Sequence, residues 1–345
     1  MRSISIALAA ILPILAALGT GCGPSPLGPA GAQAPPVCPA VPAEAPRPAV
    51  ASPAPVASTA PAPPAPAAEP AGPPPLPPAF EQALGTADGA IAAGDFAAAD
   101  KAIEAAAASA GNDAHRAFLL AHLRATRFVY EGDFEHAAAA FVAVIPELAR
   151  HPELPDEFWS HNAMMMIREA QGDPAAALAE NDQATLSATR GVWDPQRRET
   201  LAFQKDRWHR AYLTRMLAES RAGSTRAALV AYARAALDEY RARDGFPDSV
   251  AILEAYFAAL DGKRDEALAA ARRVDPAKDD DLEDLYLVVV GLDAGGDHTG
   301  AEAVRRVMRR PGPAHLARAI MLRWLDLDAK AASTRAFTPR HAGTR

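Results

Sequence analysis

The stretch GDFEHAAAAF, residues 132–141, decides the fold of this chain. A close relative of it, GDFAAADKAI, spans residues 94–103 and begins 38 residues earlier. In both stretches Gly-Asp-Phe precedes an alanine-rich amphipathic run. Glycine tolerates the left-handed conformation that ends a helix, and aspartate accepts hydrogen bonds from the free N–H groups that begin the next one. Each stretch therefore predicts a tight turn followed by the second helix of a pair.

The turn recurs along the body of the chain. Alanine stands five residues after every turn glycine, and an apolar residue stands twelve after it. Small residues also precede three of the glycines by seven positions, at Ala87, Ala125 and Ala255. We interpret these small residues as the crossing points of paired helices, with spacings of 38, 40, 51, 39 and 34 residues between glycines. The turn glycines are Gly94, Gly132, Gly172, Gly223, Gly262 and Gly296, and the alanines are Ala99, Ala137, Ala177, Ala228, Ala267 and Ala301.

This pattern resembles the tetratricopeptide repeat, a helix–turn–helix unit of about 34 residues. The resemblance covers roughly residues 80–310. It implies an all-α fold: a right-handed superhelical solenoid of about six helix–turn–helix repeats. Only the turns at Gly94 and Gly132 have the aromatic residue after Gly-Asp, and most spacings exceed the standard unit, so an irregular α–α superhelix is the alternative. The amphipathic segment after Arg310 predicts a C-terminal capping helix with a polar outer face.

We divide the chain into a signal peptide (1–21), a disordered Pro/Ala-rich linker (22–79), the helical solenoid (80–330) and a flexible tail (331–345). The first 79 residues hold 22 of the 32 prolines. They are neutral overall, and the tail carries three arginines and no acid, so the net charge of −7 leaves −10 on residues 80–330. An acidic body argues against nucleic acid as a partner, because binding to phosphates depends on Lys and Arg.

The N-terminus reads MRSISIALAAILPILAALGTGC, residues 1–22. Arg2 followed by an apolar run of about 15 residues is typical of a secretory signal and short for a bilayer span. The segment LGTGC resembles the lipobox of bacterial lipoproteins, although Gly19 stands where that family prefers leucine. The resemblance implies lipidation of Cys22 with diacylglycerol and palmitate, and Gly23 after it implies sorting to the outer membrane, facing the periplasm or the cell surface. A plain signal peptide that leaves Cys22 and Cys38 free to pair is the alternative.

Residues 23–79 alternate proline and alanine, a composition that forms extended polyproline-like chain rather than a core. Such a stalk could reach on the order of 150 Å. Cys38 lies within it, and the spacing around this cysteine does not match a metal site. The stalk would hold the folded body away from the membrane.

No catalytic, cofactor or metal motif is evident in the sequence, and we predict that the protein is not an enzyme. Met164–Met166 with His161 could suggest a soft-metal site, but consecutive helical residues point about 100° apart and cannot converge on one ion. The acidic run KDDDLEDLYL (278–287) lacks the glycine and the alternation of a calcium loop and fits the first turn of a helix. We therefore expect no cofactor, no metal and no small-molecule substrate.

The tetratricopeptide resemblance implies a groove lined by the first helix of each pair and suited to a peptide or an amphipathic helix. The leading hypothesis is a membrane-anchored scaffold that binds a partner protein in this groove. The alternatives are a cell-envelope enzyme or its non-catalytic regulatory subunit, and a structural spacer. Counting back from the turn glycines selects the groove residues His122, Thr126, Trp159, Asn162, Met166, Ile252 and Tyr256.

Overall fold

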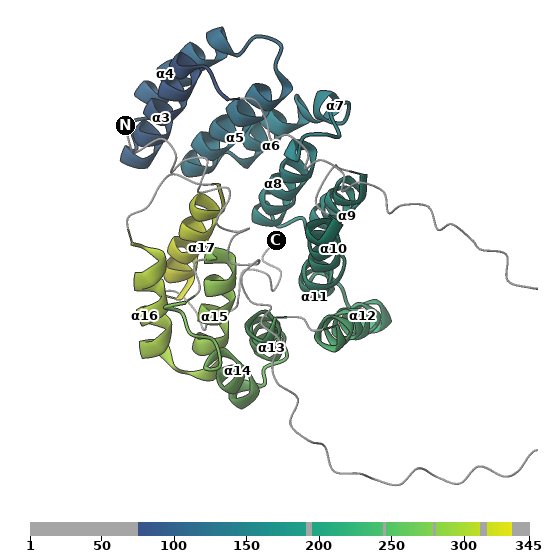
Figure 1. Ribbon diagram of the computed structural model, residues 1–345. Coiled ribbons are helices and arrows are strands. Elements are labelled where there is room, and N and C mark those ends of the chain that lie inside the picture. The colour runs from purple at the N-terminus through teal and green to yellow at the C-terminus, as the bar shows by residue number, and fades with distance from the viewer. Residues whose placement is uncertain (1–74, 191–194, 244–245, 279–280, 311–315, 333–345) are drawn as a thin grey trace, which may run out of the picture.

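The computed structural model describes residues 75–190, 195–243, 246–278, 281–310 and 316–332, and these residues form helices and the turns between them (Figure 1). The predicted signal peptide, Cys22, Cys38 and the tail lie outside the described residues. Within the described residues, no helix combines the length and the apolar character that a bilayer span requires. The helices are α3 (Pro78–Ala93), α4 (Phe96–Ala110), α5 (Ala114–Glu131), α6 (Phe134–Val142), α7 (Ile145–Leu148), α8 (Asp156–Ala170), α9 (Pro174–Arg190), α10 (Pro195–Gln204), the π-helical turn η1 (Lys205–His209), α11 (Arg210–Glu219), α12 (Gly223–Ala242), α13 (Pro247–Leu260), α14 (Arg264–Ala271), α15 (Leu282–Gly295), α16 (His298–Met308) and α17 (Leu316–Ala332).

Consecutive helices pack as pairs in chain order: α3 with α4, α5 with α6, α8 with α9, α11 with α12, α13 with α14, and α15 with α16. Five of the six predicted crossing alanines are fully buried, and so are the small residues opposite three of them. An alanine at a crossing lets two helix backbones approach closely, which is why the alanine-rich chain can pack without many aromatic residues. The buried crossing alanines are Ala99, Ala137, Ala177, Ala267 and Ala301, and the opposing ones are Ala87, Ala125 and Ala255.

The turn at Gly132 shows how each pair is joined. Gly132 has φ of 84°, and its N–H donates to the carbonyl of Val129 at 2.9 Å, which ends α5. The Asp133 carboxylate then accepts from the backbone N–H of His136 at 3.1 Å and begins α6. That hydrogen bond is the main reason why the pKa of Asp133 is lowered. The same aspartate cap is confirmed at the other predicted positions, Asp95, Asp173 and Asp297.

The fourth pair departs from the predicted register. Ala228 and Ala235 are exposed, so the crossing predicted from Gly223 is wrong. The reason is that Gly223 does not end a helix: α11 already ends at Glu219, and Gly223 is the first residue of α12. Offsets counted from this glycine therefore miss the contact face of α12, whose buried residues are Ala233, Ala236, Leu237 and Tyr240.

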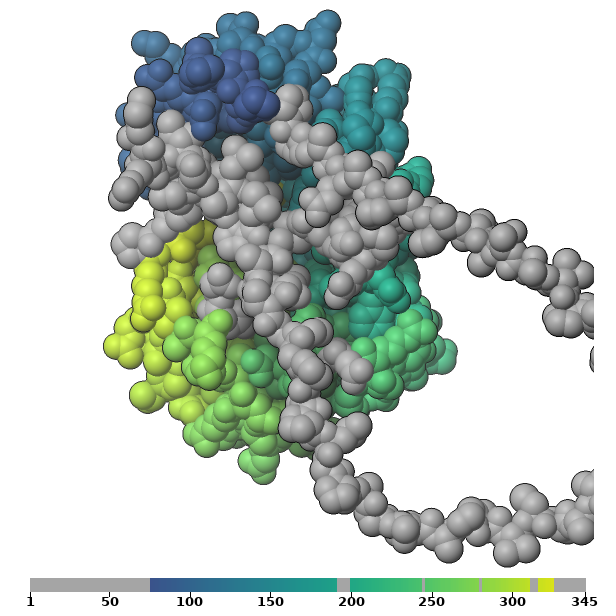
Figure 2. All heavy atoms as spheres, in the orientation of Figure 1, coloured from purple at the N-terminus to yellow at the C-terminus, as the bar shows by residue number. Residues whose placement is uncertain are grey.

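The C-terminal helix α17 is present, but it does more than cover the last pair. It contacts α15 and also α5 and α8, which lie far away in the sequence. Figure 1 shows the pairs arranged around a centre, with α17 between α15 and α5, and the space-filling view shows the parts of the chain following one another around the body, from purple through teal and green to yellow (Figure 2). The apolar face of α17 is buried in these contacts: Leu316, Ala319, Ile320, Met321, Trp324 and Leu325. Thus the two ends of the helical body are held together.

Candidate functional site: a buried polar cluster around a π-helical turn

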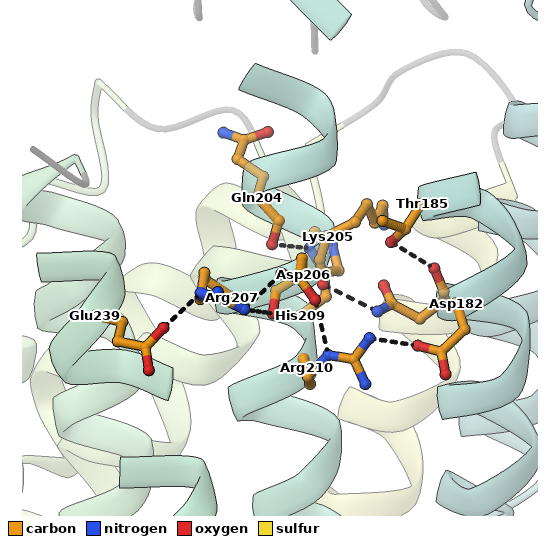
Figure 3. A network of polar contacts seen from close by, with 10 residues as sticks. Asp182, Thr185, Gln204, Lys205, Asp206, Arg207, His209, Arg210 and Glu239 are labelled. Atoms are coloured by element: carbon orange, nitrogen blue, oxygen red, sulfur yellow. Dashed lines mark hydrogen bonds and ion pairs between the residues drawn. The ribbon is translucent and has the colours of Figure 1, made fainter. Parts of the chain in front are cut away.

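The long helix from Pro195 to Glu219 is interrupted by the π-helical turn η1. Such turns are rare and are frequent at functional sites. The Lys205 carbonyl accepts a hydrogen bond from Asn181 Nδ2 of α9 at 2.9 Å. On the outer side of the turn, Arg207 Nε lies 2.8 Å from Glu239 of α12, and Arg210 Nη2 lies 2.6 Å from Asp182 of α9 (Figure 3). These contacts fix the turn between its neighbours.

On the inner side of the turn, the Lys205 side chain is buried, with 5 % of its residue surface exposed. Its ammonium group donates to the side-chain oxygen of Asn162 and lies 3.8 Å from the sulfur of Met165, both on α8. Burial lowers the pKa of Lys205 to about 8, although the carboxylates of Glu283, Asp281 and Glu169 partly oppose this change.

Glu169 lies one to two turns further along α8 and is buried. The Tyr212 hydroxyl of α11 donates to Glu169 Oε1, and Glu169 Oε2 has no hydrogen-bond partner among the described residues. Burial raises the pKa of Glu169 well above its usual value, and the nearby Glu283 carboxylate raises it further. Burial also holds the pKa of Tyr212 well above its usual value, so that its hydroxyl remains a donor.

Glu283 is a third buried ionisable side chain, and it lies in the first turn of α15, directly after the helix cap. The Asp281 carboxylate accepts from the Glu283 N–H at 2.8 Å, which confirms that the acidic run begins a helix. Burial raises the pKa of Glu283 to about 7, Asp281 adds to this, and Lys205 opposes it. Glu283 Oε1 is buried and has no hydrogen-bond partner in the part of the chain that the structure describes.

Two further side chains complete the surroundings of the cluster. The Tyr256 ring of α13 packs edge-on against Tyr212, with 5.3 Å between ring centroids. His209, on the π-turn, has its pKa lowered well below the usual value, first by burial and then by the positive charge of Lys205. The imidazole is therefore neutral at physiological pH.

Burial raises the pKa values of Glu169 and Glu283 and lowers that of Lys205, and shifted pKa values of this kind are common at functional sites. Among the described residues, no group of three or more His, Cys, Asp and Glu side chains has the arrangement of a metal site. The unpaired oxygens of Glu169 and Glu283 are also sealed from solvent.

The structure brings two of the predicted groove residues into this cluster: Asn162 accepts from Lys205, and Tyr256 packs on Tyr212. It does not gather the other predicted groove residues there. His122 lies between the rings of Phe118 and Phe141, with centroids 6.2 Å from each. Of the whole predicted set, Thr126, Met166, Ile252 and Tyr256 are buried, whereas His122, Trp159 and Asn162 are half-buried.

Sequence reasoning missed Glu169, Lys205 and Glu283. Two of them do carry a signal: Glu169 stands three residues before Gly172, and Glu283 stands thirteen before Gly296. These are the same offsets that select groove residues in the other repeats. Lys205 has no such signal, because it stands 18 residues before Gly223 and matches none of these offsets.

No protein-family model matches this chain, and neither a curated protein nor a solved structure matches it.

Proposed function

We propose that this protein is a lipid-anchored scaffold of the bacterial cell envelope that binds a partner protein on its helical-pair body. The observation that supports it most is the repeated crossing: fully buried alanines stand five residues after turn glycines, and aspartate caps begin the second helices. This is the local arrangement on which the tetratricopeptide resemblance rests. We therefore propose that the body is a right-handed superhelical solenoid of about six such repeats.

We place the partner surface on the side of α5 and α8 that carries His122, Trp159 and Asn162. These are the predicted groove residues whose side chains keep partial exposure. An aromatic ring, an imidazole and an amide are suited to a peptide or an amphipathic helix, because they combine apolar area with hydrogen-bonding groups.

A photo-crosslinking side chain at position 159, in cells that express the full chain, tests this surface. We expect a discrete crosslinked partner protein from this position. Position 232 is the control, because Tyr232 of α12 is 53 % exposed and is not among the groove residues. If the same products form from both positions, or if none forms from position 159, the proposed surface is wrong.

The lipid anchor is tested separately with Cys22→Ala. We expect the variant to leave the membrane fraction and to lose the mass of the acyl chains. Cys38→Ser is the matched control and should remain in the membrane fraction. An unlipidated wild-type protein would remove the anchor from the proposal and leave the scaffold in place.

A further inference from the structure

A groove lies on the body where α13 separates α12 from α14. The helix α13 packs against both of these neighbours, and Figure 1 shows it between them. The hollow has a volume of about 570 Å³, which is within the range of pockets that hold small ligands or large side chains. We call it the α12–α14 groove, and the lining residues that matter below are Arg234, Leu237 and Arg241 of α12, Glu254 and Phe257 of α13, and Arg273 of α14.

The α12–α14 groove is a different surface from the one placed on α5 and α8. Its residues on α12 and α14 belong to the second helices of their pairs, and its residues on α13 match none of the offsets that select groove residues in the tetratricopeptide resemblance. A ligand of this groove would therefore leave the surface around His122, Trp159 and Asn162 free.

One carboxylate connects the two sides of the groove. Glu254 Oε1 accepts from Arg241 of α12, and Glu254 Oε2 accepts from Arg273 of α14. Two guanidinium groups thus converge from different helices and share one negative charge. A guanidinium group has five N–H donors. In the part of the chain that the structure describes, Arg273 uses one of them, toward Glu254, and Arg234 uses one, toward Asp261.

The other carboxylates that line the groove are already engaged. Asp238 accepts from Arg241 of the same helix at 2.8 Å, and both oxygens of Glu266 accept from Lys263, at 3.1 and 2.9 Å. The groove therefore has N–H donors left to offer, and it has few free acceptors. Because buried apolar residues, Leu237 and Phe257, line the same hollow, the complementary chemistry is a carboxylate next to an apolar side chain.

We propose that the α12–α14 groove binds an acidic peptide segment of a partner protein, with carboxylates on the three arginines and an apolar side chain against Leu237 and Phe257. The arginines offset the charge of −10 on residues 80–330, which otherwise disfavours an acidic segment. The proposal adds a second surface to the scaffold and does not depend on the surface on α5 and α8.

Binding of a fluorescein-labelled seven-residue peptide of alternating Glu and Leu to the full chain, followed by fluorescence anisotropy, tests the groove. We expect saturable binding that weakens as NaCl is raised, because salt screens exposed charges. The same peptide with Gln in place of Glu should bind about tenfold more weakly, because it lacks the charge-assisted hydrogen bonds. A peptide with Ser in place of Leu should also bind more weakly, because it has no apolar side chain to bury.

Variants of the protein locate the binding. Arg241→Gln with Arg273→Gln should weaken binding of the Glu–Leu peptide about tenfold, because Glu254 then repels its carboxylates. Arg272→Gln on α14 is the matched control, because this side chain is 61 % exposed, pairs with Asp297 and does not line the groove. Glu254→Gln should have the opposite effect and raise the affinity, because it removes the carboxylate that competes for both arginines.

The absence of saturable binding, equal binding of the Glu–Leu peptide and either altered peptide, an equal loss in Arg272→Gln, or a fall in affinity in Glu254→Gln would overturn the proposal. Binding of laurate without binding of the peptide would overturn it too and would assign the groove to a fatty acid. The peptide series and Glu254→Gln keep the test decisive if the double arginine variant does not fold by circular dichroism. None of these measurements uses the partner crosslinked at position 159, so failure of the groove leaves the scaffold proposal standing, and failure to crosslink a partner leaves the groove standing.

Discussion

The guanidinium group of Arg323 in α17 lies directly against Gly132, the turn glycine between α5 and α6. A β-carbon built on Gly132 would overlap the Arg323 guanidinium, and the same group lies over the ring of Phe134 at 5.6 Å from its centroid. The C-terminal helix thus rests on the turn whose sequence reveals the repeat. Gly132 therefore has two roles: it adopts the positive φ of the turn, and it leaves the space in which the flexible end of the Arg323 side chain lies.

This double requirement can be separated by comparing two glycines. At Gly172 the φ of 76° is similar to that of Gly132, but the space beside it is open. We expect Gly172→Ala to cost about 1 kcal/mol, the strain of a left-handed alanine, and Gly132→Ala to cost more in urea unfolding. In an Arg323→Ala background the two substitutions should become equal. A difference that persists in this background would show that Arg323 is not its cause.

Trp324 supplies the main apolar anchor of α17. Its side chain is buried, and its ring lies 5.1 Å from that of Tyr286 on α15, measured between centroids. We expect Trp324→Ala to lower the free energy of unfolding by about 3–5 kcal/mol, as for other large side chains in cores. Leu322→Ala, at a half-buried position on the same helix, should cost clearly less. Equal costs for both would contradict the buried contact of Trp324.

The local structure of this protein could be predicted from its sequence because it is encoded locally. Glycine, aspartate and alanine at fixed offsets specify a turn, a cap and a crossing, and the buried Ala99 and Ala137 follow the prediction. The fourth pair could not be predicted in this way. There α11 already ends at Glu219, and Gly223 begins a helix instead of ending one.

The closure by α17 and the polar cluster could not be predicted because both depend on contacts between distant repeats. Arg323 meets Gly132 only once the helices have curved far enough for α17 to reach α5. Glu169 and Glu283 each look like a charged residue on one helix, and only the packed body buries them. The periodic sequence therefore predicts each helix pair more directly than it predicts the curvature of the whole helical body.

The titration of Lys205 should be visible in the stability of the protein. Its pKa falls from 10.5 to about 8 on folding, so between these values the unfolded chain binds more protons than the folded one, and stability rises with pH. From pH 8 to pH 9.5 we expect a gain of about 2 kcal/mol in the wild type. Lys205→Met should show no such gain. Urea unfolding at both pH values measures this, and an identical rise in the variant would assign it to another group.

Removal of α17 tests whether the two ends of the body depend on each other. In an open stack each pair contacts only its neighbours, so a chain ending at Arg310 would lose amide protection in α15 and α16 alone. Because α17 also packs on α5 and α8, we expect hydrogen exchange to accelerate in those helices as well, about 150 residues before the cut in the sequence.

A chain ending at Ala332, which keeps α17 and lacks only residues 333–345, is the matched control and should retain full protection. If the loss in the shorter chain stays within α13–α16, α17 is a terminal cap and does not couple the ends.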